Sequence, residues 1–187
     1  MKLKSVFLST AIVAALGATS VQAASNGTIN FTGHIIDKTC DIKIDGNASP
    51  ATVNIEAVDK SELSIAGKTA KRTGFNIELS NCSGSASVTK AAAFFENSPT
   101  VDPVTHRLLN TSTSADPKPA TNVQLQLVDA VTGDPIQIGS PNQKDSSTTY
   151  DLTSGSATLS YAVEYYATGA ATPGPITSSV NFTINYI

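Results

Sequence analysis

The sequence predicts an all-β domain in which short strands form a sandwich of two sheets. Apolar and polar residues alternate with a period of two in several short runs, which is the pattern of strands with one buried face. Clusters of Gly, Pro, Asn and Asp separate these runs, and such clusters mark turns. Because at least seven short strands are expected in one domain with weak helix signals, a sandwich is the favoured architecture.

The N-terminal residues have the three parts of a secretory signal peptide. Lys2 and Lys4 form a positively charged start, 13 apolar-rich residues follow at 6–18, and residues 21–23 (V-Q-A) offer small side chains for cleavage. The apolar stretch is too short to cross a bilayer as a permanent helix. We therefore predict a signal peptide at residues 1–23, in preference to the alternative of a buried N-terminal helix.

The mature chain that this cleavage would leave is mildly acidic. Of the 12 Lys and Arg residues, ten remain against 15 Asp and Glu, which gives a net charge of −5. The lack of a basic cluster argues against nucleic-acid binding. No second apolar segment reaches the length of a membrane span, so direct membrane insertion is not expected.

The chain has two cysteines, Cys40 and Cys82. In an exported protein the default expectation is a disulfide, because the compartment is oxidising. Closing the loop between Cys40 and Cys82 is expected to add about 4 kcal/mol to the free energy of unfolding, because it constrains the unfolded chain. The alternative is a reactive or metal-bound thiol, but neither cysteine lies in a C-x-x-C motif, and His34 and His106 lack metal-ligand spacing. No metal site is predicted.

The first predicted strand covers residues 26–36, where Ile29, Phe31, Gly33 and Ile35 share one face and polar residues occupy the other. Further strands are predicted at residues 75–79, 88–95, 123–128, 135–138, 159–166 and 180–187, and a long proline-rich surface loop, with at most a short edge strand, at 97–121.

No motif for catalysis or cofactor binding is present. Acidic residues are scattered without a close pair on one strand face, and the sequence lacks G-x-S-x-G, H-E-x-x-H and a phosphate-binding glycine loop. We therefore expect neither an enzyme nor a cofactor. The alternative, a secreted enzyme or small-molecule binder on a complete sandwich, would need a polar cleft that the sequence does not indicate.

Three motifs carry a resemblance to a known family. They are G-T-I-N-F-T-G-H-I-I-D-K-T-C at 27–40, N-I-E-L-S-N-C at 76–82 and V-N-F-T-I-N-Y-I at 180–187. Together with the signal peptide and the segment at 120–127, they resemble the major pilins of type 1 and P fimbriae, which assemble by the chaperone–usher route. The resemblance covers essentially all of residues 24–187.

The resemblance implies an incomplete immunoglobulin-like β-sandwich that lacks its final strand. Its domains would be the signal peptide, an N-terminal donor-strand extension at 24–33 and a pilin domain at 34–187. As in that family, the open sheet edge would first be filled by a periplasmic chaperone, and at the outer-membrane usher the extension of the next subunit would replace the chaperone. Periodicity alone favours a self-contained sandwich instead, with Ile29 and Phe31 in its first strand and Phe182 and Ile184 in its last.

The resemblance also implies which residues act in this exchange. The donor strand would present Ser25, Gly27, Ile29, Phe31 and Gly33 to the neighbouring groove. Members of the family have a glycine at the position of the donor strand that Gly27 would occupy.

The edge that the chaperone and the donor strand both use would be the C-terminal strand. The residues implied there are Val180, Phe182, Ile184, Tyr186 and Ile187, the last through its terminal carboxylate.

The expected function is therefore a structural subunit of a surface fimbrium that supports adhesion after export through the periplasm. The expected partners are identical or homologous pilin subunits, the periplasmic chaperone and the outer-membrane usher. The alternative is a minor adaptor or tip-associated subunit, or an adhesin.

Overall fold

The computed structural model describes residues 29, 30, 32, 33, 35, 37, 39–84 and 86–187. The chain divides into two compact units, Met1–His34 and Ile35–Ile187. The fold described below is that of the second unit. The predicted signal peptide and Ser25, Gly27 and Phe31 of the predicted donor strand lie outside the described residues.

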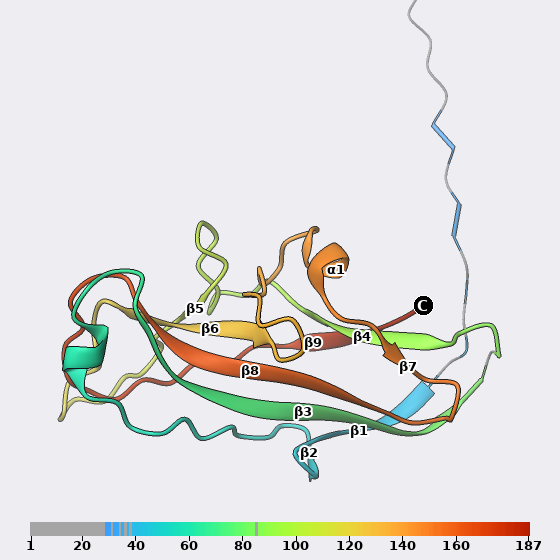
Figure 1. Cartoon of the computed structure of the whole chain (residues 1–187), viewed down its shortest axis with the longest axis horizontal. Coiled ribbons are helices and arrows are strands. Elements are labelled where there is room, and N and C mark those ends of the chain that lie inside the picture. Colours follow the sequence, from blue (N-terminus) through green and yellow to red (C-terminus); the bar gives the residue numbers. More distant parts are fainter. Residues whose placement is uncertain (1–28, 31, 34, 36, 38, 85) are drawn as a thin grey trace, which may run out of the picture. The chain divides into compact units, whose positions relative to one another are not determined.

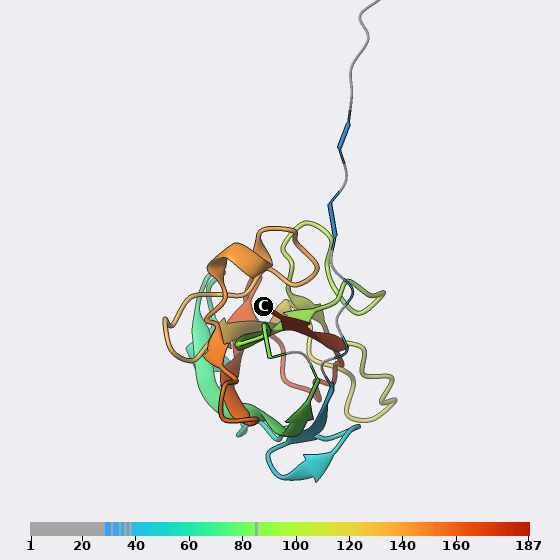
Figure 2. The same ribbon diagram turned by 90° about the vertical axis from the view of Figure 1, so that its right-hand side faces the viewer.

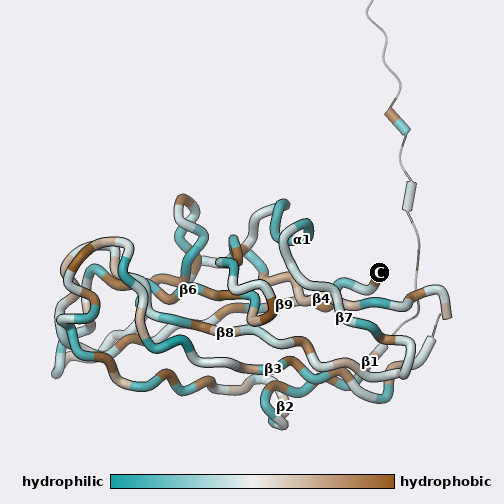
Figure 3. Tube along the Cα trace, viewed as in Figure 1, coloured by the Kyte–Doolittle hydropathy of each residue, from teal (hydrophilic) through white to brown (hydrophobic). Residues whose placement is uncertain are grey.

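Six strands, all paired antiparallel, form the larger sheet (Figure 1). In spatial order they are β2 (Asn47–Ala48), β1 (Thr39–Ile44), β3 (Thr69–Ser83), β8 (Ala157–Ala167), β6 (Val123–Asp129) and β5 (Leu108–Leu109). The long strands β3 and β8 pair from Thr69 opposite Tyr166 to Leu79 opposite Ala157. Hydrophobic and hydrophilic residues alternate along them (Figure 3), which buries one face of the sheet.

The smaller sheet contains three antiparallel strands. They are β7 (Tyr150–Asp151), β4 (Lys90–Phe95) and β9 (Phe182–Tyr186), with β4 in the middle. The two sheets face each other around a common interior (Figure 2). Two short helices, η1 (Lys60–Leu63) and α1 (Gln143–Ser146), lie in the connections between strands. The Asp59 side chain caps η1 by accepting a hydrogen bond from the Ser61 amide at 2.8 Å.

Tyr161 of β8 occupies the centre of the core. Its ring packs edge-on against Phe95 at 5.1 Å, so it joins the larger sheet to β4. Its hydroxyl accepts a hydrogen bond from the Ala93 amide at 3.1 Å. Burial raises the pKa of Tyr161 to about 12, so the phenol stays protonated at neutral pH. The core therefore contains a polar group whose hydrogen bond is satisfied inside it.

The outer face of the larger sheet also buries polar side chains. Glu164 accepts from Arg72 Nε at 2.9 Å and from Gln126 Nε2 at 2.8 Å, and Gln126 in turn accepts from Arg107 Nε at 2.7 Å. The Arg107 guanidinium lies 3.5 Å above the ring of Tyr166. These contacts cover β6 and β8 on the side away from the core.

The all-β prediction is confirmed. The strands predicted at 75–79, 123–128 and 159–166 lie within β3, β6 and β8, and those predicted at 88–95 and 180–187 contain β4 and β9 with a few residues to spare. The prediction of a strand at 135–138 is wrong: Pro135 makes one isolated bridge to Val128, and the Ile136 amide donates to Leu127 at 2.8 Å, but pairing stops there. The segment predicted as a loop at 97–121 contains one short strand, the two-residue β5.

The predicted strand at 26–36 is also not observed: its described residues carry no strand, and pairing begins at Thr39 in β1. β1 itself was not predicted. Within the described part of the chain, no helix has the length and apolarity needed to cross a membrane.

Candidate functional site

A groove runs along the second unit between two extended segments. The first wall is residues 50–58, which follow β2, and the second wall is residues 171–182, which lead into β9. Two cavities of about 660 and 560 Å³ make up the groove, and both are lined by Ile55. In Figure 2, β1 and β9 lie on the same side of the interior.

The floor of the groove is the inner face of the larger sheet. Its members on β3, β6 and β8 are apolar or aromatic: Phe75, Ile77, Val123, Leu125, Leu127, Val163 and Tyr165. All of them belong to the hydrophobic core of the domain. A segment that entered the groove would therefore pack directly on the core.

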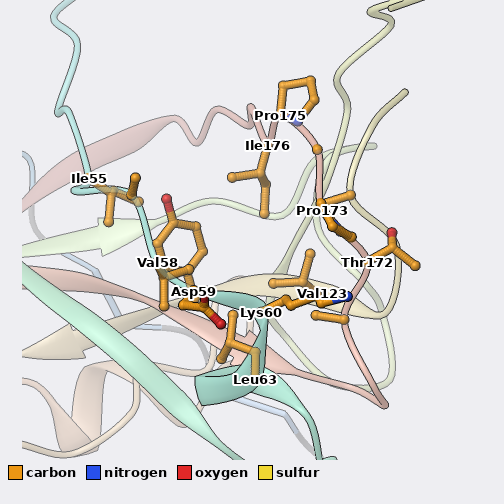
Figure 4. Close-up of a pocket in the computed structure, with 15 residues that line it drawn as sticks. Ile55, Val58, Asp59, Lys60, Leu63, Val123, Thr172, Pro173, Pro175 and Ile176 are labelled. Carbon is orange, nitrogen blue, oxygen red and sulfur yellow. The ribbon is translucent and has the colours of Figure 1, made fainter. Parts of the chain in front are cut away.

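The smaller cavity ends the groove beside the proline-rich turn of the second wall. Figure 4 shows Ile55 and Val58 on one segment facing Pro173, Pro175 and Ile176 on the other. Leu63 of η1 and Val123 of β6 contribute apolar surface between these walls, in the same cavity. Gly174 permits this turn, because a Cβ there would lie 2.1 Å from the Lys118 carbonyl oxygen.

Side chains alternate strictly from Ile176 in the second wall to the end of β9. The even-numbered residues from Ile176 to Tyr186 are buried or half-buried, and the odd-numbered residues between them are exposed. This is the pattern of one continuous extended strand. Only its last part is paired, because β4 ends at Phe95 opposite Phe182.

Among the described residues, the pairing partner of β9 is β4, on the side away from the groove. Ile187 and Lys90 exchange two backbone hydrogen bonds at 2.8 and 2.9 Å, and the Glu96 amide donates to Asn181 at 2.8 Å. In an antiparallel pair every second residue makes such bonds, so β4 pairs with the odd-numbered residues. The residues whose backbone N–H and C=O groups point away from β4 are Phe182, Ile184 and Tyr186.

The same parity continues into the second wall. The Thr111 amide donates to the Thr177 carbonyl at 2.8 Å, and the Thr100 hydroxyl donates to the Ser179 carbonyl at 2.7 Å. These odd-numbered carbonyls therefore point away from the groove. No backbone hydrogen bond to a described residue is made by Ile176, Ser178 or Val180.

The first wall is unpaired as well. Ala51, Val53 and Ile55 are half-buried, whereas Thr52 and Asn54 between them are exposed, so this wall is also extended with one face inward. Its backbone makes no hydrogen bond to any other residue that the structure describes. The groove thus lies between two segments that both have free main-chain donors and acceptors, and open edges of this kind invite another strand.

The groove is poor in groups that could perform chemistry. Its charged lining residues are Asp59 and Lys60 in the smaller cavity and Glu96 in the larger one. Hydrogen bonds from Ser61 lower the pKa of Asp59, which keeps this carboxylate charged. Among the described residues, Ser178 Oγ is the one buried side-chain nitrogen or oxygen without a hydrogen-bond partner. The lining therefore suits binding of an extended apolar peptide and not proton transfer.

A disulfide joins β1 to β3. Cys40 of β1 is bonded to Cys82 of β3, with a Cα–Cα distance of 4.1 Å, so the disulfide prediction is confirmed. Burial raises the pKa of the Tyr186 phenol, although a hydrogen bond with the Cys40 backbone opposes this effect. Tyr186 thereby connects β9 to β1 across the interior.

The predicted edge residues all lie on or beside β9. Phe182, Ile184 and Tyr186 direct their side chains inward and their backbone groups away from β4, and Val180 and Phe182 line the larger cavity. Ile187 is placed differently, because its backbone is bonded to Thr89 and Lys90 of the β4 side and its side chain is exposed.

Only two of the five predicted donor residues are described. The side chain of Ile29 is 77% exposed. At Gly33 an added Cβ would meet no atom within 4 Å.

Sequence reasoning missed the first wall and the N-terminal part of the second. Both carry the same signal, an inward apolar residue at every second position: Ala51, Val53 and Ile55 in one, Ile176 and Val180 in the other. Each run is short and borders a proline, which obscures a strand pattern.

Comparison with known protein families gives a match over most of the domain. Residues 55–187 match the sequence profile of the type-1 fimbrial protein A family, FimA. The major fimbrial subunit SMF-1 of Stenotrophomonas maltophilia (strain K279a) is 45% identical over 166 residues, which cover 87% of this chain and 94% of that protein. The F17 fimbrial protein of Escherichia coli is 36% identical over 177 residues, covering 93% and 94%.

Among solved structures, the crystal structure of the P pilus rod subunit PapA has a similar fold. The TM-score is 0.57, and the match covers 79% of this chain and 99% of that one. At 18% identity, this similarity concerns the fold alone.

Proposed function

Because the chain belongs to the type-1 fimbrial protein family, we propose that it is the major subunit of a fimbrial shaft and polymerises by accepting a β-strand from a sister copy. Its relatives are structural fimbrial subunits, and the chain is a structural protein rather than an enzyme. The family implies a place in a surface fimbrium. Beyond this, we propose the strand exchange itself and the action of a chaperone and an usher before it.

The observation that carries the proposal is the groove with two unpaired walls over an apolar floor. An inserted strand would bond to the free N–H and C=O groups that alternate from Ile176 to Tyr186. Its inward side chains would cover Phe75, Leu125 and the other floor residues. Main-chain bonds would supply affinity and the alternate side chains specificity, as in other cases of strand addition.

The proposed occupant is the N-terminal segment 24–33 of the next subunit. Ile29 and Phe31 would supply apolar area, about 1.5–3 kcal/mol for each side chain when fully buried. Ser25, Gly27 and Gly33 share their face in an extended strand. Because the side chain of Ile29 is 77% exposed, burying it in a neighbour would gain most of this transfer free energy.

Before assembly the same edge would be occupied by a periplasmic chaperone, and the outer-membrane usher would catalyse the replacement. A subunit with an open apolar groove needs such protection, because unpaired edges and exposed core surface promote aggregation. Removal of residues 1–23 during export would release the donor segment. Val180, Phe182, Ile184 and Tyr186 are the proposed chaperone contacts, with Ile187 contributing the terminal carboxylate.

The composition of purified fimbriae tests the major-subunit assignment. We expect this chain to be the dominant protein after the fibres are dissociated in hot acid and separated by mass. The assignment is supported by the 45% identity with a major fimbrial subunit. If the chain were instead a minor adaptor or a tip-associated subunit, it would be found in trace amounts beside another dominant protein.

A further inference from the structure

The turn that follows β3 makes a very close contact with the backbone that precedes β1. Gly84, whose φ is +106°, lies so near Asp37 that an added Cβ would be 2.5 Å from the Asp37 carbonyl oxygen and 2.8 Å from its carbonyl carbon. No side chain can be accommodated at such distances from backbone atoms, and φ in this range also favours glycine. Glycine is therefore required for residue 37 to lie where it does.

Two further contacts lie directly beside this one. Thr39 is paired with Ser83, and their hydroxyl oxygens are 3.3 Å apart. Cys40 is joined to Cys82 by the disulfide. We call the contacts of residues 37, 39 and 40 with residues 82–84 the clasp. From residue 37 onward the clasp fixes the chain to the end of β3.

The clasp lies near the start of the second compact unit. Ile35 is fully exposed, at 104%, and the boundary between the two units falls just before it. The clasp thus lies close to the point where the chain passes from the N-terminal segment to the folded domain.

We propose that Gly84 is a positioning residue that fixes the backbone at residue 37, from which the chain leads to the donor segment. This inference rests on the proposed donor-strand exchange. In such a fibre the donor segment belongs covalently to one subunit and lies in the groove of the next. The few residues between the clasp and the inserted strand are then the covalent joint between subunits, so the orientation of residue 37 sets the rotation from each subunit to the next.

The test is the variant Gly84→Ala, with Gly46→Ala as the matched control. Gly46 also has positive φ, +77°, but an added Cβ there would meet nothing within 4 Å. The control therefore carries the backbone strain without the collision with Asp37. Both variants are assembled into fibres, and the helical twist and rise per subunit are measured by electron cryomicroscopy.

We expect Gly84→Ala fibres to differ from the wild type in twist, or to lose a single defined twist, while Gly46→Ala fibres keep it. Binding of a synthetic peptide of residues 25–35 to the purified subunit should be unchanged in both variants, because the groove is not altered. Wild-type twist in well-formed Gly84→Ala fibres would overturn the inference. Failure of the peptide to bind even the wild-type subunit would instead count against the proposed function itself.

A second variant covers the case in which Gly84→Ala does not fold. Thr39→Val combined with Ser83→Ala removes the hydroxyl contact of the clasp and leaves the disulfide in place. The expected result is a smaller change of twist in the same measurement. If this variant folds and its twist equals that of the wild type, the clasp does not set the geometry and the inference fails.

Discussion

Replacing Ile29 and Phe31 together with aspartate is expected to abolish fibre formation while the domain stays folded. Each substitution removes apolar area worth about 1.5–3 kcal/mol on burial and would place a carboxylate on an apolar floor without a partner. The domain should tolerate the change, because Ile29 is exposed in its own subunit. Fibre yield is measured by electron microscopy, and folding by capture of the variant with its chaperone.

The matched control for this variant is the pair Asn30→Asp and Thr32→Asp. These residues are exposed and alternate with the donor residues, so they lie on the opposite face of an extended strand. The control adds the same charge and should still form fibres. Normal fibres from the Ile29 and Phe31 variant would contradict the donor assignment, and so would equal loss of fibres in the control.

Removing the disulfide with Cys40→Ser and Cys82→Ser is expected to cost about 2–5 kcal/mol of the free energy of unfolding. The bond closes a loop with a sequence separation of 42 residues, which restricts the unfolded chain. It also holds β1, next to the first wall, against β3. The measurement is urea denaturation of the subunit filled with donor peptide, for the oxidised wild type and the variant.

Reduced wild-type protein serves as the control for the serine side chains and should unfold at the same urea concentration as the variant. The account would be contradicted if the variant and the oxidised wild type differed by less than about 0.5 kcal/mol, the size of an ordinary surface substitution.

The elements that could be predicted from the sequence are mainly the strands whose alternating apolar residues pack on the core. β3 and β8 lie inside the larger sheet, and their alternating residues pack on the core, so local pattern and fold agree. β6 alternates as cleanly, yet its outward residues Gln124 and Gln126 are buried. Side chains of residues 102–107 cover them by hydrogen bonds, a tertiary contact that the local pattern does not encode.

The groove itself could be predicted only in part. β9 was expected as an edge because its motif resembles the last strand of known pilins. The first wall was not expected, and its backbone makes no hydrogen bond to the part of the chain that the structure describes. Its apolar run is short, and Pro50 and Pro173 at the two walls weaken the strand pattern. The clasp was also missed, because a glycine after a strand indicates a turn and not the segment that packs against it.

The central claim is that the domain lacks one strand and takes it from a sister copy. The most direct measurement is thermal and urea unfolding of the purified subunit, without chaperone, before and after addition of a synthetic peptide of residues 25–35, with a scrambled peptide as control. The account predicts a large stabilisation by the native peptide alone and protection of the Phe182, Ile184 and Tyr186 amides from hydrogen exchange. Unchanged stability and exchange, with a peptide-free subunit that is already fully stable, would contradict it.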